Sequence, residues 1–135
     1  LMQMTRMTIA INELKKNNLP YIVVISNPTT GGLSASIVST SDICIGEGGP
    51  NGGATYAFAG RRIVEATTKS ELPSDFQTVS WQMSKGQCDM VLDRKDIIPT
   101  IGSLLSILLK KNKLQNSKEK ESLIEEPPFE NKEAS

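Results

Sequence analysis

Main-chain N–H groups around a pair of glycines are the groups of this sequence best suited to chemistry. Gly31 and Gly32 follow the apolar stretch Tyr21–Ser26, which predicts a buried strand, and they precede a stretch that predicts a helix. Paired glycines let a ligand approach the main chain closely, and the first N–H groups of a helix have no partner inside it. Two such amides can stabilise one developing negative oxygen, such as that of an enolate. The sequence therefore predicts an anion hole at Gly31 and Gly32.

Side chains offer few alternatives to these amides. The sequence has no His and only two Cys, and neither Cys44 nor Cys88 has a second Cys or His at metal-ligand spacing. We expect two buried free thiols, while the spacing alone also allows a disulfide. Asp42 and Glu47 are the nearest carboxylates along the chain, and turn capping and loop solvation are their expected roles. Chemistry carried by backbone amides is thus the leading hypothesis by elimination.

Composition limits the class of protein. With 135 residues the chain is one domain or a piece of one, and its formal net charge of +0 gives no broad electrostatic reason to bind nucleic acid or an anionic membrane. No apolar run approaches the roughly 18 residues that span a bilayer, and no secretion signal is visible at the start. Because the chain starts at Leu1 and enters helical periodicity at once, we expect a fragment or a split subunit.

The elements that must position the glycine pair alternate between short strands and helices. This order predicts an α/β fold of stacked β-β-α layers or an open parallel sheet. Strands are expected at residues 21–26, 42–46, 55–60 and 90–92, and helices at residues 1–17, 31–40, 61–67, 76–85 and 97–109.

Local signals mark several boundaries. Ser74 or Asp75 should cap the helix at 76–85, and Gly86 should end it in a left-handed conformation. The glycine-rich segment 47–53 lacks the Lys-Ser or Lys-Thr ending of a phosphate loop, so a flexible surface loop is expected. We divide the chain into an ordered part, residues 1–110, and a polar, charged tail, residues 111–135, that is expected to be disordered.

Several short motifs, in a fixed order, give the sequence a family resemblance that covers residues 1–110. The motifs are Leu1–Met4, Leu19–Ile22, Pro28–Gly32 followed by Ser34–Ser36, Asp42–Ile45, Phe58–Glu65, Leu72–Gln77, Lys85–Val91 and Thr100–Leu105. Each motif alone is weak, but their combined order and spacing are specific. With them the sequence resembles the carboxyltransferase β subunit of bacterial and plastid multi-subunit acetyl-CoA carboxylase.

The resemblance implies a crotonase-like fold, a superhelix of β-β-α turns, of which this chain would be a partial domain. It also implies transfer of a carboxyl group from carboxybiotin to acetyl-CoA, which gives malonyl-CoA for fatty acid biosynthesis. In the family pattern Gly31 and Gly32 match the oxyanion hole. The residues that match the substrate site are Thr30, Phe58, Ala59, Gly60 and Arg62.

The partners implied by the resemblance are a carboxyltransferase α subunit, a second β subunit and the carrier protein that bears biotin. The rest of the β subunit would be a further partner, and zinc would be held only on its ribbon, outside this sequence. We expect the exposed Met-rich first helix and the apolar last helix to be covered by such partners. The expected location is the plastid stroma, with a bacterial cytoplasm as the alternative.

Two other functions stay open. One is a non-catalytic structural or regulatory subunit with a degenerate acyl-CoA site, because the segment Gly48–Thr55 is longer than the usual family connection and Ser41 replaces a usual glycine. The other is a hydratase or isomerase of the crotonase kind, which would need a positioned carboxylate such as Asp42 or Glu47.

Overall fold

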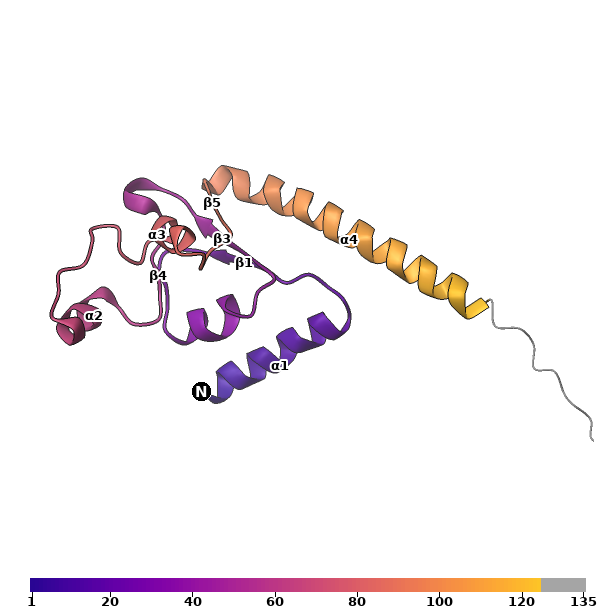
Figure 1. The fold of residues 1–135 in the computed structure, drawn as a ribbon, viewed down its shortest axis with the longest axis horizontal. Coiled ribbons are helices and arrows are strands. Elements are labelled where there is room, and N and C mark those ends of the chain that lie inside the picture. Colours follow the sequence, from indigo (N-terminus) through magenta and orange to yellow (C-terminus); the bar gives the residue numbers. More distant parts are fainter. Residues whose placement is uncertain (125–135) are drawn as a thin grey trace, which may run out of the picture.

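The backbone of residues 1–124 is described by a computed structural model, and side chains are described as far as residue 109 (Figure 1). The elements in chain order are α1 (Met2–Lys16), β1 (Ile22–Ile25), β2 (Thr29–Thr30), the π-helix η1 (Ser34–Val38), β3 (Ile43–Glu47), the 3-10 turn η2 (Pro50–Gly52), β4 (Tyr56–Ala57), α2 (Arg61–Thr68), α3 (Val79–Ser84), β5 (Met90–Leu92) and α4 (Arg94–Ile124).

Two small parallel sheets organise the molecule. One has three strands in the order β1-β3-β5, and the other pairs β2 with β4. Ile22 pairs with Ile43 in the first sheet, and Thr29 pairs with Tyr56 in the second. Parallel neighbours need a crossover between them, and η1 lies between β1 and β3 in the chain as α2 and α3 lie between β3 and β5. The prediction of an α/β fold with parallel strands is therefore confirmed.

The core lies where the sheet meets α3. Ile25, Ile45 and Val79 are fully buried. Gly46 of β3 packs so tightly on α3 that an added Cβ would lie 2.6 Å from Cβ of Val79. Both thiols, Cys44 and Cys88, are buried and free, as the sequence predicts.

Several boundaries follow the local signals. Helix α1 and strand β1 lie where they are expected. Gly86 has φ +75°, and the N–H of Gln87 donates to the carbonyl of Gln82 at 2.9 Å, so α3 ends in the predicted left-handed glycine.

Other details differ from the sequence prediction. The N-cap of α3 is Thr78, whose hydroxyl accepts from the N–H of Trp81 at 3.2 Å, and the expected caps Ser74 and Asp75 lie before it. The strand β1 is not covered on both faces, because Val24 remains 39% exposed. The segment expected as a flexible loop contains the turn η2, closed by an N–H···O bond from Ala54 to Glu47 at 2.9 Å.

The first and last helices leave much apolar surface uncovered. Helix α1 contacts η1 but buries only Ile11, and Leu1 is 93% exposed. Helix α4 extends away from the sheet (Figure 1), and Ile98 on its first turns is 80% exposed. Helical backbone continues to Ile124, beyond the end near residue 109 that the pattern predicts. The expected disordered tail falls largely outside the described side chains, and residues 125–135 lie outside the described chain.

Candidate active site

The glycine pair lies between β2 and η1. Gly31 has φ +64°, a left-handed conformation that glycine adopts without steric cost, and an added Cβ would meet nothing within 4 Å. Gly32 follows in helical conformation against α1, where an added Cβ would lie 3.1 Å from the sulfur of Met4. Conformation therefore explains the glycine at position 31, whereas at position 32 a Cβ would only have to displace the flexible end of Met4 slightly.

The amide of Gly31 is not free, which corrects part of the predicted anion hole. Its N–H donates to the carbonyls of Ala57 at 3.2 Å and Phe58 at 3.1 Å. The cause is the parallel pairing of β2 with β4, which places Thr30 opposite Ala57 and so brings the next amide under the end of β4. In this conformation Gly31 shapes the turn but has no donor left for a ligand.

The next three amides are the unpaired ones. Among the described residues, the N–H groups of Gly32, Leu33 and Ser34 have no hydrogen-bond partner, as the first turn of a helix requires. The hydroxyl of Ser34 donates to the carbonyls of Gly31 at 2.7 Å and Ala57 at 2.9 Å, which fixes the start of η1 against β4. Because η1 is short, its dipole adds little, and any anion stabilisation would come from the N–H groups themselves.

A cavity of about 340 Å³ lies between the start of η1, the end of β4 and α3. The structure thereby brings the two sequence motifs, the glycine turn and the Phe58–Gly60 turn, to one place, since both Ser34 and Phe58 line this space. The lining residues are Ser34, Ala35, Tyr56, Ala57, Phe58, Gln82 and Gln87. Sequence reasoning missed Gln82 and Gln87. No local pattern indicates that the side-chain amide of Gln82 donates to the carbonyl of Tyr56 on a distant strand, at 2.7 Å.

The other expected substrate residues lie around this cavity rather than in it. Thr30 is exposed on β2, and Ala59 is held through its carbonyl by Nε2 of Gln77 at 2.7 Å. Gly60 caps α2 in extended conformation, and an added Cβ there would meet nothing within 4 Å, so sterics do not require glycine. Arg62 is exposed on the first turn of α2.

Arg61, the neighbour of Arg62, has a structural task. Its guanidinium contacts Glu65 at 2.9 Å and donates to the carbonyls of Leu72 at 2.5 Å and Pro73 at 2.7 Å. These bonds hold α2 to the segment that leads into α3. Of the two arginines, the exposed Arg62 is therefore the one whose charge can meet a ligand.

The two candidate carboxylates do not line the cavity at Phe58. Asp42 accepts from the N–H of Tyr21 at 2.8 Å and lies 3.7 Å from Nζ of Lys15. Glu47 lies 3.6 Å from the guanidinium of Arg94. Both are thus engaged in turn capping or ion pairing, so a carboxylate base for hydratase chemistry is not placed beside the glycine turn.

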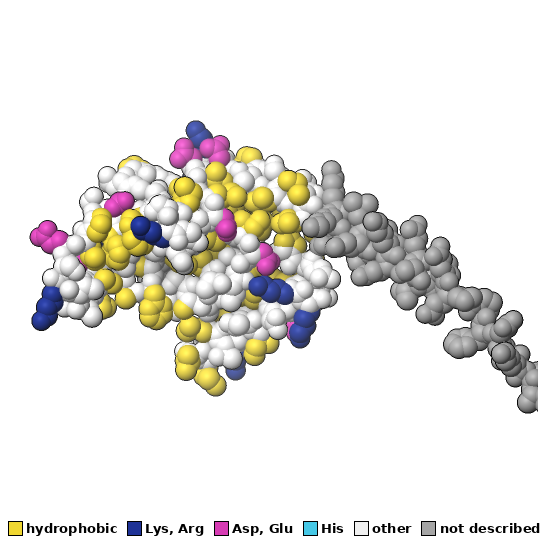
Figure 2. Space-filling view, viewed as in Figure 1, with side chains coloured by type: hydrophobic (Ala, Val, Ile, Leu, Met, Phe, Trp, Pro, Cys, Tyr) yellow, Lys and Arg dark blue, Asp and Glu magenta, His cyan; other side chains and the backbone are white. Residues whose placement is uncertain are grey.

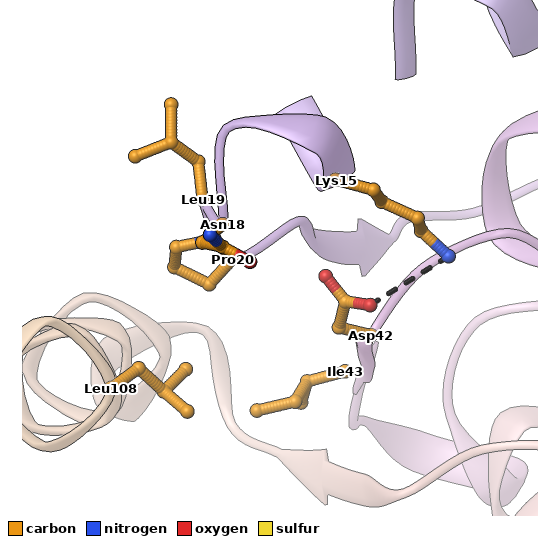
Figure 3. A pocket seen from close by; sticks show the side chains of 7 residues that line it. All are labelled: Lys15, Asn18, Leu19, Pro20, Asp42, Ile43 and Leu108. Atoms are coloured by element: carbon orange, nitrogen blue, oxygen red, sulfur yellow. Dashed lines mark ion pairs between the residues drawn. The ribbon is translucent and has the colours of Figure 1, made fainter. Parts of the chain in front are cut away.

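Asp42 instead borders a second cavity, of about 440 Å³, between the end of α1 and α4 (Figure 3). Ile43 and Leu108 face each other across it, and the ion pair of Lys15 and Asp42 closes one side. Its walls are mainly apolar and carry no nucleophile.

The thiols are not placed as nucleophiles either. A hydrogen bond from Cys44 lowers the pKa of Cys88 to about 7, and the same contact together with burial raises the pKa of Cys44. Both side chains are 5% exposed and belong to the core rather than to the cavity wall. Within the described part of the chain, no group of three or more His, Cys, Asp or Glu is arranged to hold a metal ion.

A search for membrane spans gives a simple result. Among the described residues, no helix has both the length and the apolar character needed to cross a bilayer.

Comparison with known proteins gives consistent matches to one kind of protein. No family model matches the chain. The acetyl-coenzyme A carboxylase carboxyl transferase subunit beta of Pelagibacter ubique is 52% identical over 122 residues, which are 90% of this chain and 38% of that protein. The subunit of the same name from Hirschia baltica is 49% identical over 109 residues, 81% of this chain and 30% of that protein.

A third relative, from Agrobacterium fabrum, has the same name and is 46% identical over 110 residues, 82% of this chain and 36% of its own length. Identity of this degree over most of the chain leaves no doubt about common descent. The chain is homologous to the beta subunit of the acetyl-CoA carboxylase carboxyl transferase, over about a third of that subunit's length.

Proposed function

We propose that this chain forms part of a carboxyltransferase that moves a carboxyl group from carboxybiotin to acetyl-CoA, giving malonyl-CoA. The observation that carries the proposal is the identity of 52% to a subunit with that name, which extends over 90% of the chain. A crotonase-like fold belongs to the same proposal, and the short parallel strands separated by helices are compatible with it.

The chain's own contribution would be to bind the acyl thioester and stabilise its enolate. Removal of a proton from the methyl carbon puts negative charge on the thioester oxygen, and preorganised N–H donors favour that state over the neutral one. The unpaired amides at Gly32 and Leu33 are the available donors, while Gly31 supplies the turn that presents them. The cavity at Phe58 would receive the acyl end, and Arg62 offers a positive charge to the rest of the ligand.

Carboxybiotin, held on a separate carrier protein, would supply the carboxyl group. We expect an α subunit and a second β subunit to complete the complex, because the relatives are named as one subunit of a carboxyl transferase. The chain spans between 30% and 38% of those relatives, so the rest of a β subunit is a further expected partner. Those relatives are bacterial, so we place the complex in a bacterial cytoplasm; they give no support to a plastid stroma.

A chimeric β subunit tests the proposal. The 122 matched residues of the Pelagibacter ubique subunit are replaced by this chain, and malonyl-CoA formation is measured with the α subunit and carboxylated carrier. Gly32→Pro removes one N–H yet suits the first turn of a helix, so kcat should fall by about 10²- to 10³-fold.

The matched control is Gly32→Ala, which keeps the N–H and meets only the flexible end of Met4. Its kcat should stay within a few-fold of the parent. Equal activity of the Pro and Ala variants would refute a catalytic role for this amide.

A second function, a non-catalytic subunit of the same complex, is favoured by one observation. The Gly31 amide is already hydrogen bonded to Ala57 and Phe58, so the pair does not present two free donors. In that case the chimeric complex would assemble normally and make no malonyl-CoA.

A further inference from the structure

The segment Tyr56–Ala59, whose first three residues form one wall of the cavity at Phe58, is held by its carbonyl groups. Each of its four carbonyls accepts a hydrogen bond from a residue outside the segment. The donors are Gln82 Nε2 to Tyr56 at 2.7 Å, Ser34 Oγ to Ala57 at 2.9 Å, Gly31 N to Ala57 at 3.2 Å and to Phe58 at 3.1 Å, and Gln77 Nε2 to Ala59 at 2.7 Å. The wall is therefore fixed by several elements rather than by its own two-residue strand.

Gln77 has a special place among these donors, because it holds both ends of the wall. Its carbonyl accepts from the N–H of Tyr56 at 2.8 Å, and its side-chain amide donates to the carbonyl of Ala59. The residue is 7% exposed, so these bonds form away from water, where they are strong and costly to lose.

The backbone of Gln77 is also unusual. Its φ is +68°, in the left-handed region that glycine or asparagine adopts more easily. Such conformations persist only where the surroundings impose them, and they cluster at ligand clamps and active sites. Of the described non-glycine residues with positive φ, Gln77 is the one that is buried; Asn18, Asn51 and Lys69 are exposed.

We propose that Gln77 is a positioning residue that sets the width of the acyl cavity and thereby makes the site select a two-carbon over a three-carbon acyl thioester. The inference rests on the proposed function. The carbonyl of Gln77 holds the segment at Tyr56, and its side-chain amide holds it at Ala59, so loss of the side-chain bond alone frees the Phe58–Ala59 end to shift outward. With Gln77 in place the cavity keeps its width, and a longer acyl group is excluded.

Substitution of Gln77 by glycine removes the side-chain hydrogen bond to Ala59 without straining the backbone. Glycine adopts the positive φ easily, so the backbone strain is relieved while the segment is no longer held at Ala59. Gln77→Asn also tolerates this φ, but its amide is one carbon too short to reach the carbonyl. The matched control is Lys69→Gly, which relieves the same kind of backbone conformation at an exposed site away from the wall.

The variants are measured in the chimeric complex as kcat and KM for acetyl-CoA and propionyl-CoA. Since one methylene in a fitted pocket is discriminated by about 10-fold or more, the preference for acetyl-CoA should fall by about that factor in both Gln77 variants. Lys69→Gly should leave the preference unchanged. A preference that stays within twofold of the parent in both Gln77 variants, whatever their thermal stability, would overturn the inference.

Failure of the proposed function gives a different result. Calorimetric binding of acetyl-CoA and propionyl-CoA to the same complexes reports the fit of the acyl group without turnover. One outcome is that the parent complex makes no malonyl-CoA but binds acetyl-CoA more tightly than propionyl-CoA, and that the Gln77 variants lose this preference. The proposed carboxyltransferase activity is then wrong, while the role of Gln77 stands. If the parent binds both thioesters equally, the role of Gln77 is refuted as well.

Discussion

The glycine turn and the α1–α4 side of the molecule are built in opposite ways. Around the turn, the carbonyls of Tyr56–Ala59 are all hydrogen bonded. On the α1–α4 side, Met2 is 77% exposed, Ile98 80% and Ile107 66%. Figure 2 shows hydrophobic side chains in several groups on one face, with few charged ones between them. We infer from this difference that the chain fixes the geometry of its own site, whereas its outer helices keep apolar surface that a partner can bury.

The largest effect is expected from breaking the packing beneath the site. In Gly46→Ala the new methyl group would lie 2.6 Å from Cβ of Val79, a fully buried residue that has no room to move. Such overpacking should lower the free energy of unfolding by about 3 kcal/mol. Urea unfolding of the chain, followed by the fluorescence of its single tryptophan, Trp81, measures this change.

Gly102→Ala on α4 is the matched control, because nothing lies within 4 Å of an added Cβ there. Alanine is the better helix former, so this variant should be more stable by about 1 kcal/mol. Equal effects of the two substitutions would mean that the two regions do not differ in packing.

A charge placed on α4 tests whether its exposed apolar surface is an interface with a partner. Ile98→Glu should not destabilise the isolated chain, since the side chain is 80% exposed, but it should weaken assembly of the chimeric β subunit with its partners by about tenfold or more. Sedimentation measures the assembly. Ala66→Glu adds the same charge to an exposed position of α2 and should leave assembly intact. Normal assembly of Ile98→Glu would remove this part of α4 from the interface.

A smaller effect is expected at the start of α3. The Thr78 hydroxyl accepts from the N–H of Trp81, so Thr78→Ala should lower the free energy of unfolding by about 1 kcal/mol. Thr78→Ser keeps the acceptor and should retain most of the stability. The comparison is made by the midpoint of urea unfolding, and a loss of similar size in the serine variant would point to the methyl group rather than the cap.

Local signals account for what the sequence predicts well. Helix α1, strand β1 and the end of α3 at Gly86 each depend on periodicity or on one residue type within a few positions. The site is harder to predict, because the N–H of Gly31 donates to the carbonyls of Ala57 and Phe58, far along the chain, where two strands of two residues each pair. Such short strands carry no alternation that could reveal their pairing.

The glutamines of the site were missed for a related reason. Gln77 and Gln82 act by reaching carbonyl groups on β4 and the turn after it, and those contacts exist only after the chain has folded. Glutamine is mostly an exposed residue type, so neither the residue itself nor its neighbours along the chain indicate these contacts. By contrast, cysteine is among the most often buried residue types and Cys44 lies between Ile43 and Ile45, so burial of the thiols could be expected from the sequence.

The last prediction concerns these thiols, which should make the stability of the core depend on pH. A hydrogen bond from Cys44 lowers the pKa of Cys88 to about 7 in the folded chain, below the ordinary thiol value of 9.0. Between these two values the unfolded chain binds more protons than the folded one, so the free energy of unfolding should rise with pH, by at most about 1.4 kcal/mol per unit. Above the ordinary value the raised pKa of Cys44 reverses the sign, and stability should decline again.

Urea unfolding with reductant at a series of pH values tests this sequence of slopes. Cys44→Ala removes the donor, so its stability is lower at every pH but should no longer rise between neutral pH and the ordinary thiol pKa. The difference in the free energy of unfolding between the intact chain and the variant is then largest at the alkaline end of that window. A simple loss of packing would give the same difference at every pH in this range. A parallel pair of curves would show that Cys88 keeps its proton in the core and that the contact between the two thiols is one of packing alone.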